Sequence, residues 1–391
     1  MTFPKTADVV VIGGGVIGTS IAFHLARLGA GEVLLLERKQ LAAGATGTSS
    51  GLVRMHYDNP LEAEIAFKGF EIFQNFDEIV GGDCGFTRTG FLRTVKPHNL
   101  ENLKANIVML QSLGVNTRLV ERDEIREIAP YLTLDDIPLA AYEPDAGYAD
   151  PHMTTMGFAN AARRHGAQIF QSTPVTAIQV NGGRVTGVQT PQGSIAAPVI
   201  VNAAGAWGGL VAAQAGIELD LSIRHHQVAV VESPPEMPWP HLTVIDRLHR
   251  IYLRPETGRL TLVGASHDNY YITAEQLDTF SEILTYETRN RVLERLCTRI
   301  PIMETAAVHK GHAGVYPCTP DTHALLGAAP GVEGFYCATG FSGHGFKEGP
   351  IVGQAMAELI LKGRAEVVDI TPLRLTRFEE SEPYRVPHQY E

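Results

Sequence analysis

The chain has 391 residues, of which 44% are hydrophobic and 19% are charged, and it contains 39 glycines and 23 prolines. This composition is typical of a globular protein with many tight turns, and it excludes a disordered, collagenous or coiled-coil chain. The formal net charge of −11 comes without a basic run, so we expect no nucleic-acid partner. Four cysteines in so long a chain indicate neither a disulfide framework nor a C-x-x-C metal site, which favours the reducing cytoplasm.

The start of the chain predicts a β-α-β unit. Residues 8–12 suit a buried strand, residues 16–28 a helix, and residues 32–38 a second buried strand. Four glycines interrupt the apolar segment 9–23 and no basic segment precedes it, so we expect neither a signal sequence nor a membrane span.

Further along, apolar spacing and turn residues predict alternating helices and strands. Helices are expected at 60–80, 99–113, 121–129, 274–299 and 349–361, and in a helix–strand pair within 146–170. Strands are expected at 91–95, in a meander that ends at 198–205, in a hairpin at 250–266 and at 334–338. Asp150 and Pro151 mark one helix start, because Asp caps a helix and Pro suits its first position.

Gly13, Gly15 and Gly18 form a G-x-G-x-x-G turn between the first strand and the first helix. Such glycines allow a tight turn, the approach of backbone to a pyrophosphate, and close packing of helix on strand. Glu37 ends the second strand, where a carboxylate can accept hydrogen bonds from ribose hydroxyls. The pattern predicts a dinucleotide site without choosing between FAD and NAD, and Arg38 and Lys39 leave a 2′-phosphate open.

Three later segments follow in order: the loop GATGTSSGLVR (44–54), the strand and turn VNAAGAWGG (201–209), and GFSGHGFKEGP (340–350). Together with the N-terminal unit they resemble the glycine/D-amino-acid oxidase superfamily of flavoproteins, and within it the sarcosine oxidase-like branch. The resemblance extends over essentially the whole chain. It implies an α/β fold in which a Rossmann-like FAD-binding domain of the glutathione-reductase type is interleaved with an antiparallel-sheet substrate domain.

We assign residues 1–82, 146–220 and 310–391 to the discontinuous FAD-binding domain, and residues 83–145 and 221–309 to the substrate-binding domain. The residues expected to contact FAD are Gly13, Gly15, Val16, Ile17, Gly18, Glu37, Arg38, Thr46, Ser49, Ser50, Gly51, Leu52, Val175, Ala204, Gly205, Trp207, Gly343, His344, Gly345 and Lys347.

The resemblance also implies a substrate site. Arg54 belongs to an Arg-x-x-Tyr sequence in which the family holds the substrate carboxylate, and an arginine fork suits that task. A surface arginine, or one paired with Asp58, is the structural alternative. Lys347 matches the lysine that completes this clamp. Tyr252 matches a pocket tyrosine, and His344 is expected to lie near the cofactor.

Other histidines suggest no metal site. His309 and His312 are three residues apart and His225 and His226 are adjacent, but no further ligands at metal-binding spacing surround them. We therefore expect no metal. His312 and His323 could still approach the flavin. The sequence contains no G-x-S-x-G motif or Cys/His pattern of the kind that would indicate a hydrolase.

Two positions depart from the family. Gly314 stands where monomeric sarcosine oxidases carry the cysteine that tethers FAD, so we expect non-covalent FAD; Cys318 would need a register slip to serve. Counting back from His267 places Val263, flanked by Leu262, where those oxidases carry the lysine that activates oxygen.

These observations predict an FAD-dependent enzyme that oxidises the C–N bond of a small amino acid or a secondary amine such as sarcosine. Hydride would pass to flavin N5, and the resulting imine would hydrolyse. The electron acceptor is O₂, a quinone, a partner protein or an artificial dye. The alternatives are a dehydrogenase subunit of a larger assembly and a flavin-binding protein without amine chemistry. The sequence sets no oligomeric state.

Overall fold

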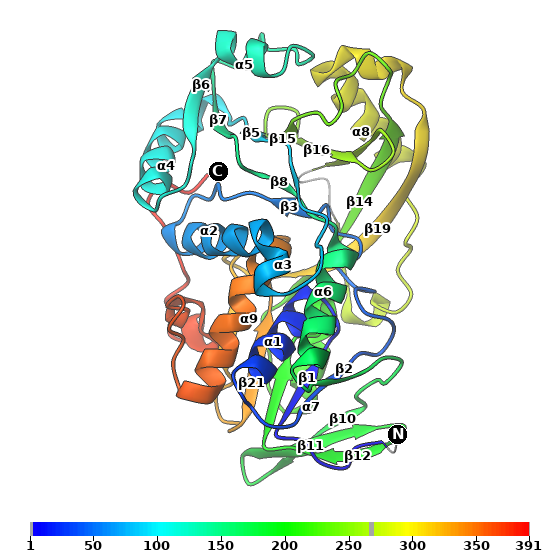
Figure 1. Ribbon diagram of the computed structural model, residues 1–391, viewed down its shortest axis with the longest axis vertical. Helices are drawn as coiled ribbons and strands as arrows, with labels where there is room; N and C mark the ends of the chain where they lie inside the picture. The colour runs from blue at the N-terminus through cyan, green and yellow to red at the C-terminus, as the bar shows by residue number, and fades with distance from the viewer. Residues whose placement is uncertain (1–2, 266–269, 391) are drawn as a thin grey trace.

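The structure is a computed structural model that describes residues 3–265 and 270–390. Two large sheets organise the chain (Figure 1). A six-stranded sheet lies in the lower half of the view with α1, α6, α7 and α9, and a nine-stranded sheet extends through the upper half with α4, α5 and α8. The expected combination of a Rossmann-like unit with a second sheet is therefore present. The second sheet is antiparallel except where residues 91–93 and 243–245 pair in parallel.

The six-stranded sheet has the order β20-β21-β13-β1-β2-β9, with every neighbouring pair parallel except β20–β21. Its strands are β1 (Val9–Ile12), β2 (Val33–Leu36), β9 (Gln168–Phe170), β13 (Val199–Asn202), β20 (Leu325–Ala328) and β21 (Phe335–Thr339). The helices that accompany it are α1 (Val16–Arg27), α6 (Pro151–Arg164), α7 (Gly208–Gln214) and α9 (Gly345–Lys362).

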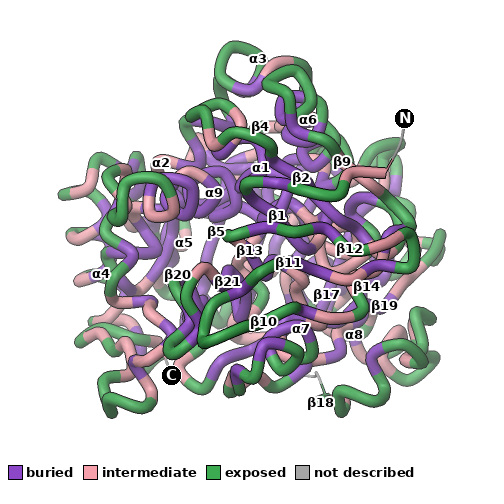
Figure 2. Tube along the Cα trace, turned by 90° about the horizontal axis from the view of Figure 1, so that it is seen from below, coloured by how far each residue is buried: buried purple, intermediate pink, exposed green. Residues whose placement is uncertain are grey.

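Both faces of this sheet are covered, which is why β1 is apolar at every position. Val9 and Val11 pack in the core that contains α1, α2 and α9. Val10 and Ile12 pack in a second core with a three-stranded sheet and α7. That small sheet comprises β10 (Ala177–Asn181), β11 (Arg184–Thr190) and β12 (Gly193–Ala196). β1 and β2 are buried at every position, and α1 is buried from residue 16 to residue 25, in the purple interior of Figure 2.

The nine-stranded sheet has the order β18-β14-β17-β16-β15-β5-β7-β6, and β19 pairs with β14. Its strands are β5 (Phe91–Arg93), β6 (Arg118–Glu121), β7 (Leu139–Glu143), β14 (Ser222–Glu232), β15 (Thr243–Asp246), β16 (Ile251–Glu256), β17 (Leu260–Ala265), β18 (Tyr270–Ile272) and β19 (Val308–Cys318). The hairpin expected at 250–266 is β16–β17, and its last residue lies outside the described ranges. The assigned domain boundaries stay a prediction.

The remaining elements connect these layers. The helices are α2 (Pro60–Gln74), α3 (Phe76–Ile79), α4 (Leu100–Ser112), α5 (Arg122–Ile128) and α8 (Tyr286–Arg299), and a third small sheet contains β3 (Leu52–Val53), β4 (Thr87–Arg88) and β8 (Gly147–Tyr148). Short 3₁₀ turns occur at Pro97–Asn99, Gly205–Trp207, Ala274–Gln276, Pro301–Thr305, Thr371–Leu373 and Leu375–Arg377.

The expected start of α6 is confirmed, since the Asp150 side chain accepts a hydrogen bond from Met153 N and Pro151 is the first helical residue. Three predicted helices differ from the structure. The helix expected at 60–80 is divided at Asn75 into one helix at Pro60–Gln74 and another at Phe76–Ile79. The helix expected at 274–299 is a short 3₁₀ turn followed by α8, because Thr285 caps a new helix start through Thr288 N. The helix expected from residue 349 begins at Gly345 and contains Pro350 in its second turn.

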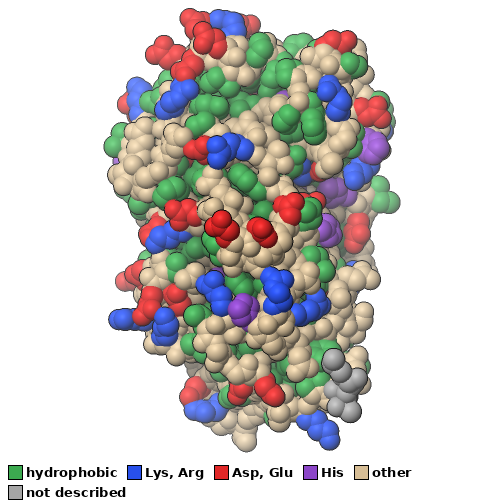
Figure 3. Space-filling model, viewed as in Figure 1, with side chains coloured by type: hydrophobic (Ala, Val, Ile, Leu, Met, Phe, Trp, Pro, Cys, Tyr) green, Lys and Arg blue, Asp and Glu red, His purple; other side chains and the backbone are tan. Residues whose placement is uncertain are grey.

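None of the helices in the described ranges is both long and apolar enough to cross a bilayer. On the face shown in Figure 3, acidic and basic side chains are interspersed over most of the surface.

Candidate cofactor and substrate cavity

A cavity of about 810 Å³ collects nearly all of the predicted site residues. It is lined by the β1–α1 turn, the 43–58 segment, the 203–207 turn, the start of α9 and strands of the nine-stranded sheet. All predicted FAD contacts line it except Gly18 and Gly51, and so do Arg54 and Tyr252. A cavity of this volume and lining has the size of a cofactor site with room for a small substrate.

Gly13 and Gly18 act through close packing. Gly13 has φ +114°, and a Cβ there would lie 2.3 Å from the Ala203 carbonyl oxygen. A Cβ on Gly18 would lie 1.9 Å from the Gly13 carbonyl oxygen, so only glycine lets α1 meet β1. At the helix start, Val16 N donates to Thr46 Oγ1 at 3.1 Å. An open helix N-terminus with a hydroxyl beside it is suited to a phosphate.

Glu37 lies at the carboxyl end of β2, where its side chain is 9% exposed and faces the cavity. Its Oε2 accepts from Gly14 N and its Oε1 from Lys39 N, both at 2.7 Å. These bonds fix the carboxylate at the edge of the sheet. Gly51 has φ +65° and a Cβ there would meet the Ala149 carbonyl oxygen at 2.2 Å, so it shapes the loop rather than lining the cavity.

Arg38 and Trp207 meet at the same end of the cavity, although they are far apart in sequence. The Arg38 Cζ lies 4.6 Å from the Trp207 ring centre. Both side chains also reach Asp278, through a 2.5 Å ion pair from Arg38 and a 3.0 Å hydrogen bond from Trp207 Nε1. Sequence reasoning did not include Asp278, because nothing near it marks a motif.

Backbone at the start of α9 faces the cavity at Gly343, His344 and Gly345. Gly343 has φ +89°, a conformation that favours glycine. Because α9 has 18 residues, its N-terminus presents partial positive charge toward a bound anion or reduced ring. Burial lowers the pKa of His344 well below 6.5, with Lys347 and Arg54 adding to the effect. Its Nδ1 is buried with no partner among the described residues.

Arg54 and Lys347 both lie close to one aromatic ring, that of Tyr57. The predicted carboxylate clamp requires these two side chains to be neighbours. Arg54 Cζ lies 4.6 Å and Lys347 Nζ 5.4 Å from the Tyr57 ring centre. Both cations are buried, at 7% and 5% exposure. Arg54 donates to the His56 carbonyl oxygen and Lys347 to that of His344, and neither forms an ion pair with a described carboxylate.

Two buried carboxylates, Glu348 and Glu62, lie near Arg54 and Lys347. The Tyr57 hydroxyl donates to Glu348 Oε1 at 2.8 Å, and Glu62 Oε1 lies 2.7 Å from His323 Nδ1. Burial raises the pKa of Glu348, and the nearby Glu62 charge raises it further. The sequence contained a signal for Tyr57, the last residue of Arg-x-x-Tyr, but none for Glu62, which lies on α2.

Tyr252 faces the cavity from β16. Its hydroxyl lies 2.7 Å from His226 Nε2, and the two rings stack at 5.7 Å. Burial raises the pKa of Tyr252, so the hydroxyl stays protonated. A Cβ on Gly264 would lie 2.3 Å from the Tyr252 ring, which explains the glycine opposite it in the sheet.

The two family departures are located in the structure. Gly314 lines the cavity, and a Cβ there would lie 2.2 Å from Thr48 Oγ1, whereas Cys318 is buried and does not line it. Val263 packs inside an apolar core and is fully buried, so it does not face the cavity either. His267, from which the count was made, lies outside the described residues.

The histidines considered in the sequence analysis lie in different parts of the structure. His312 and His323 line the cavity, while His309 is half exposed near Glu232. Within the described ranges, three ligand atoms come within 4.8 Å of one another at Glu62, His344 and Glu348. Both carboxylates in that group already have protein partners, and none of the paired histidines contributes.

A family model described as FAD-dependent oxidoreductase, DAO, matches residues 8–359. The chain belongs to the DAO family of FAD-dependent oxidoreductases. The resemblance and the cofactor predicted from the sequence are thereby confirmed.

The similarity to individual proteins supports the same family. The chain is 32% identical to human mitochondrial sarcosine dehydrogenase over 97% of its length and 29% identical to mouse mitochondrial dimethylglycine dehydrogenase over 94%. It spans only 42% and 44% of those proteins. The crystal structure of L-proline dehydrogenase from P. horikoshii superimposes with a TM-score of 0.89 at 29% identity, covering 98% of this chain and 100% of that one.

The cavity fits FAD. The close approach at Gly13, the open start of α1 and the Glu37 carboxylate suit the adenosine diphosphate portion, and the start of α9 suits the ring. The orphaned Nδ1 of His344 is a polar atom that a bound group would satisfy. The roles given to individual residues stay predictions.

Proposed function

We propose that this chain oxidises the C–N bond of a small N-substituted amino acid such as sarcosine. The observation that carries the proposal is the pair of buried cations, Arg54 and Lys347, on one side of the FAD-family cavity. Burying charges that form no ion pair costs several kcal/mol per ion, so a cavity that keeps two of them is suited to an anion. The substrate carboxylate is that anion.

The clamp would determine where the substrate lies. Arg54 offers a planar fork that binds a carboxylate through two hydrogen bonds, and Lys347 adds a point charge. Fixing the carboxylate places the C–H next to nitrogen toward the ring, and good orientation of this kind is worth roughly 7–11 kcal/mol. FAD, when bound, supplies the hydride acceptor.

The same charges would favour the uncharged amine. A positive charge close to a second one disfavours it, so Arg54 and Lys347 lower the pKa of an amine bound beside them. The neutral His344 and the protonated Tyr252 add no further charge. No side chain has to remove a proton from carbon in this scheme, and the imine that forms hydrolyses in water.

Dehydrogenase activity is the preferred form of this reaction. Val263, the residue that counting from His267 gives, is buried in an apolar core and does not line the cavity. The described lysines that do line it are Lys39, which follows β2, and Lys347 of the clamp, so no further lysine of the described residues is available beside the ring. The proteins similar to this chain that are named sarcosine dehydrogenase and L-proline dehydrogenase support the same choice. Electrons would then pass to a quinone, a partner protein or a dye rather than to O₂. We keep a cytoplasmic location as part of the proposal, although several relatives are named mitochondrial.

A non-catalytic flavin protein is the alternative from another class. The chain is also 28% identical, over 93% of its length, to the mouse pyruvate dehydrogenase phosphatase regulatory subunit. The paired Arg54 and Lys347 argue for catalysis, because a protein without amine chemistry has no use for buried cations beside its cofactor.

The test is anaerobic bleaching of the flavin absorbance by N-methyl, cyclic and D-amino acids. We expect a secondary amino acid to reduce the flavin, and Arg54→Ala to lower kcat/KM at least about 100-fold while FAD content is unchanged. Arg88→Ala is the matched control, because Arg88 is exposed on β4. Absence of bleaching by every amine would reject the catalytic proposal, and near-wild-type kinetics in Arg54→Ala would reject the clamp.

A further inference from the structure

A second basic cluster lies beside the clamp. Arg93, Arg247 and Tyr390 line the main cavity and also a smaller cavity of about 270 Å³. The smaller cavity is completed by Val95, Lys96, Asn99 and Arg250. The two cavities therefore share one wall, and that wall contains two arginines.

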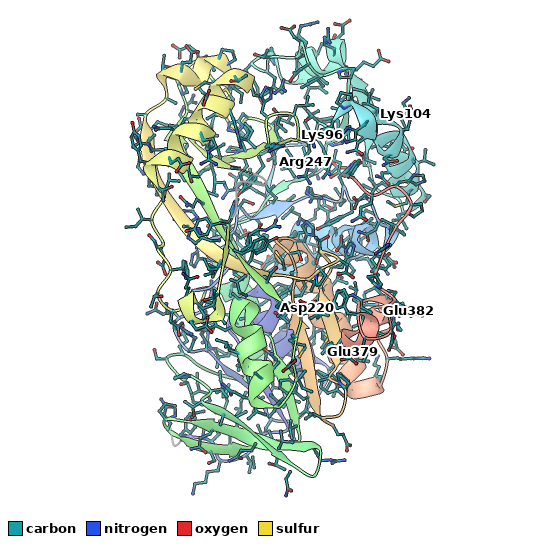
Figure 4. The ribbon with its side chains drawn as sticks, turned by 180° about the vertical axis from the view of Figure 1, so that it is seen from behind. Lys96, Lys104, Asp220, Arg247, Glu379 and Glu382 are labelled. Atoms are coloured by element: carbon teal, nitrogen blue, oxygen red, sulfur yellow. The ribbon has the colours of Figure 1, made fainter. Side chains whose placement is uncertain are left out.

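The small cavity is strongly positive. Four of its lining side chains, Arg93, Lys96, Arg247 and Arg250, are basic, and none of the described lining residues is acidic. Lys96 and Arg247 lie close together in Figure 4, in the part of the molecule where β5 and β15 pair. Like charges brought together in this way repel one another unless an anion joins them.

Arg93 is the clearest example of a buried cation in this wall that lacks an ion-pair partner among the described residues. It is 5% exposed, yet its guanidinium forms no hydrogen bond or ion pair with a residue in the described ranges, and its Nε is buried without a partner. Its contact is the Tyr390 ring, 4.3 Å from Cζ. A buried arginine held only by an aromatic ring is under-compensated, because transfer of a charge out of water requires a partner.

The wall is rigidly held. Arg93 ends β5, which is paired on both sides with β15 and β7. Arg247 N donates to Thr94 Oγ1 at 2.9 Å, and Thr94 in turn donates to Asp246. Burial lowers the pKa of Arg247 to about 9, with the charges of Arg93 and Arg54 adding to the effect. The cations are thus fixed near one another and near the clamp.

Two acidic residues, Asp58 and Glu143, act on Arg93 through their charges but form no ion pair with it. Asp58 lines the main cavity and accepts a 2.9 Å hydrogen bond from Tyr390 N. Glu143 is fully buried, accepts from Met55 N, and has its pKa raised to about 7 by burial. Neither forms an ion pair with Arg93 within the described part of the chain.

We propose that Arg93 and Arg247 bind a second anionic group of the substrate. The substrate class is then an N-substituted amino acid with two carboxylates, one on the Arg54 and Lys347 clamp and the other on the shared wall. This inference rests on the proposed amine oxidation for its first carboxylate. The second site depends on geometry that the clamp does not use.

A matched substrate pair tests it. N-methyl-L-glutamate and N-methyl-L-glutamine have the same shape and differ in one charge. We expect kcat/KM for flavin reduction to be at least tenfold higher for the glutamate, the size of one charge-assisted hydrogen bond, with most of the difference in KM. Arg93→Gln should remove the preference, and Arg93→Lys should restore part of it.

The control is Lys104→Gln, which changes the net charge equally on the outer helix α4, away from both cavities (Figure 4). It should leave the glutamate preference intact. If both substrates are oxidised equally, or if Arg93→Gln slows both alike, the second anion site is wrong while amine oxidation stands. If neither substrate nor sarcosine reduces the flavin, the proposed function is what fails.

Binding of a non-oxidisable ligand gives an independent measurement. Glutarate should raise the melting temperature of the FAD-bound protein more than glutaramate does, and Arg93→Gln should abolish that difference. Equal shifts from the two ligands in the wild type would overturn the proposal without any reference to turnover.

Discussion

Tyr57 links the two cations of the cavity to a buried carboxylate: its hydroxyl donates a 2.8 Å hydrogen bond to Glu348 Oε1, and its ring contacts both Arg54 and Lys347. Burial and the Glu348 charge raise the pKa of Tyr57, so the hydroxyl remains a donor. Glu348 is not among the described residues that line the cavity, so its carboxylate offsets the positive charge without occupying the space proposed for the substrate.

Tyr57→Phe tests this arrangement. The ring remains, but Glu348 Oε1 loses its donor, and a buried polar atom without a partner costs about 1–3 kcal/mol. We expect a lower melting temperature, kcat/KM reduced by roughly tenfold, and unchanged FAD content. Tyr286→Phe is the control, because Tyr286 is 71% exposed. Equal stability and kinetics in both variants would contradict the link.

Lys347 should give the reaction an alkaline limit. Burial and the Arg54 charge lower the pKa of Lys347 below its ordinary value of 10.5. Below that pKa the ammonium binds the carboxylate, and above it the neutral amine does not, so kcat/KM falls as pH rises through the lowered pKa.

The pH profile of Lys347→Arg checks this assignment. Arginine stays charged across the range, so the alkaline fall should move to higher pH or vanish, while kcat/KM near neutrality is kept within about tenfold. Lys68→Arg, at a half-buried surface ion pair with Glu64, is the control and should keep the wild-type profile. An identical alkaline limb in Lys347→Arg would assign it to another group.

Much of this site could be predicted because its signals are local. Gly13, Gly15 and Gly18 lie within one turn, and Lys347 lies within one continuous motif. The supporting residues could not be found in this way. Arg93, Glu62 and Tyr390 are brought to the cavity by sheet pairing and chain packing, and no spacing in the sequence connects them.

The same distinction explains where the elements predicted from the sequence differ from those in the structure. A strand or helix with clear periodicity, such as β1, α1 or β16–β17, was predicted close to its bounds. The break before α8 depends on one side chain, Thr285, which competes with helix propagation by capping a new start. Counting residues placed Val263 beside the flavin, but strand alternation buries it in a core.

FAD should be held without a covalent bond. The Gly314 position has no room for a larger side chain unless Thr48 moves, and Cys318 does not line the cavity. Acid precipitation should therefore release yellow flavin into the supernatant. Gly314→Cys should behave in the same way, since the 2.2 Å approach to Thr48 Oγ1 opposes the new side chain. Flavin that stays in the wild-type pellet would show a tether elsewhere.

Reoxidation by air should be slow. Charge builds on O₂ as the first electron arrives, and a correctly placed cation stabilises it by several kcal/mol, which corresponds to several powers of ten in rate. Val263 does not line the cavity, and of the described lysines that do, Lys39 follows β2 beside Glu37 and Lys347 is assigned to the substrate carboxylate. We expect substrate to reduce the flavin much faster than air reoxidises it, and an artificial acceptor dye to raise turnover.

Val263→Lys should destabilise the core rather than speed reoxidation, because it buries an unpaired charge among Leu253 and Ala229. Stopped-flow absorbance measures both half-reactions, and reoxidation as fast as reduction would make the protein an oxidase.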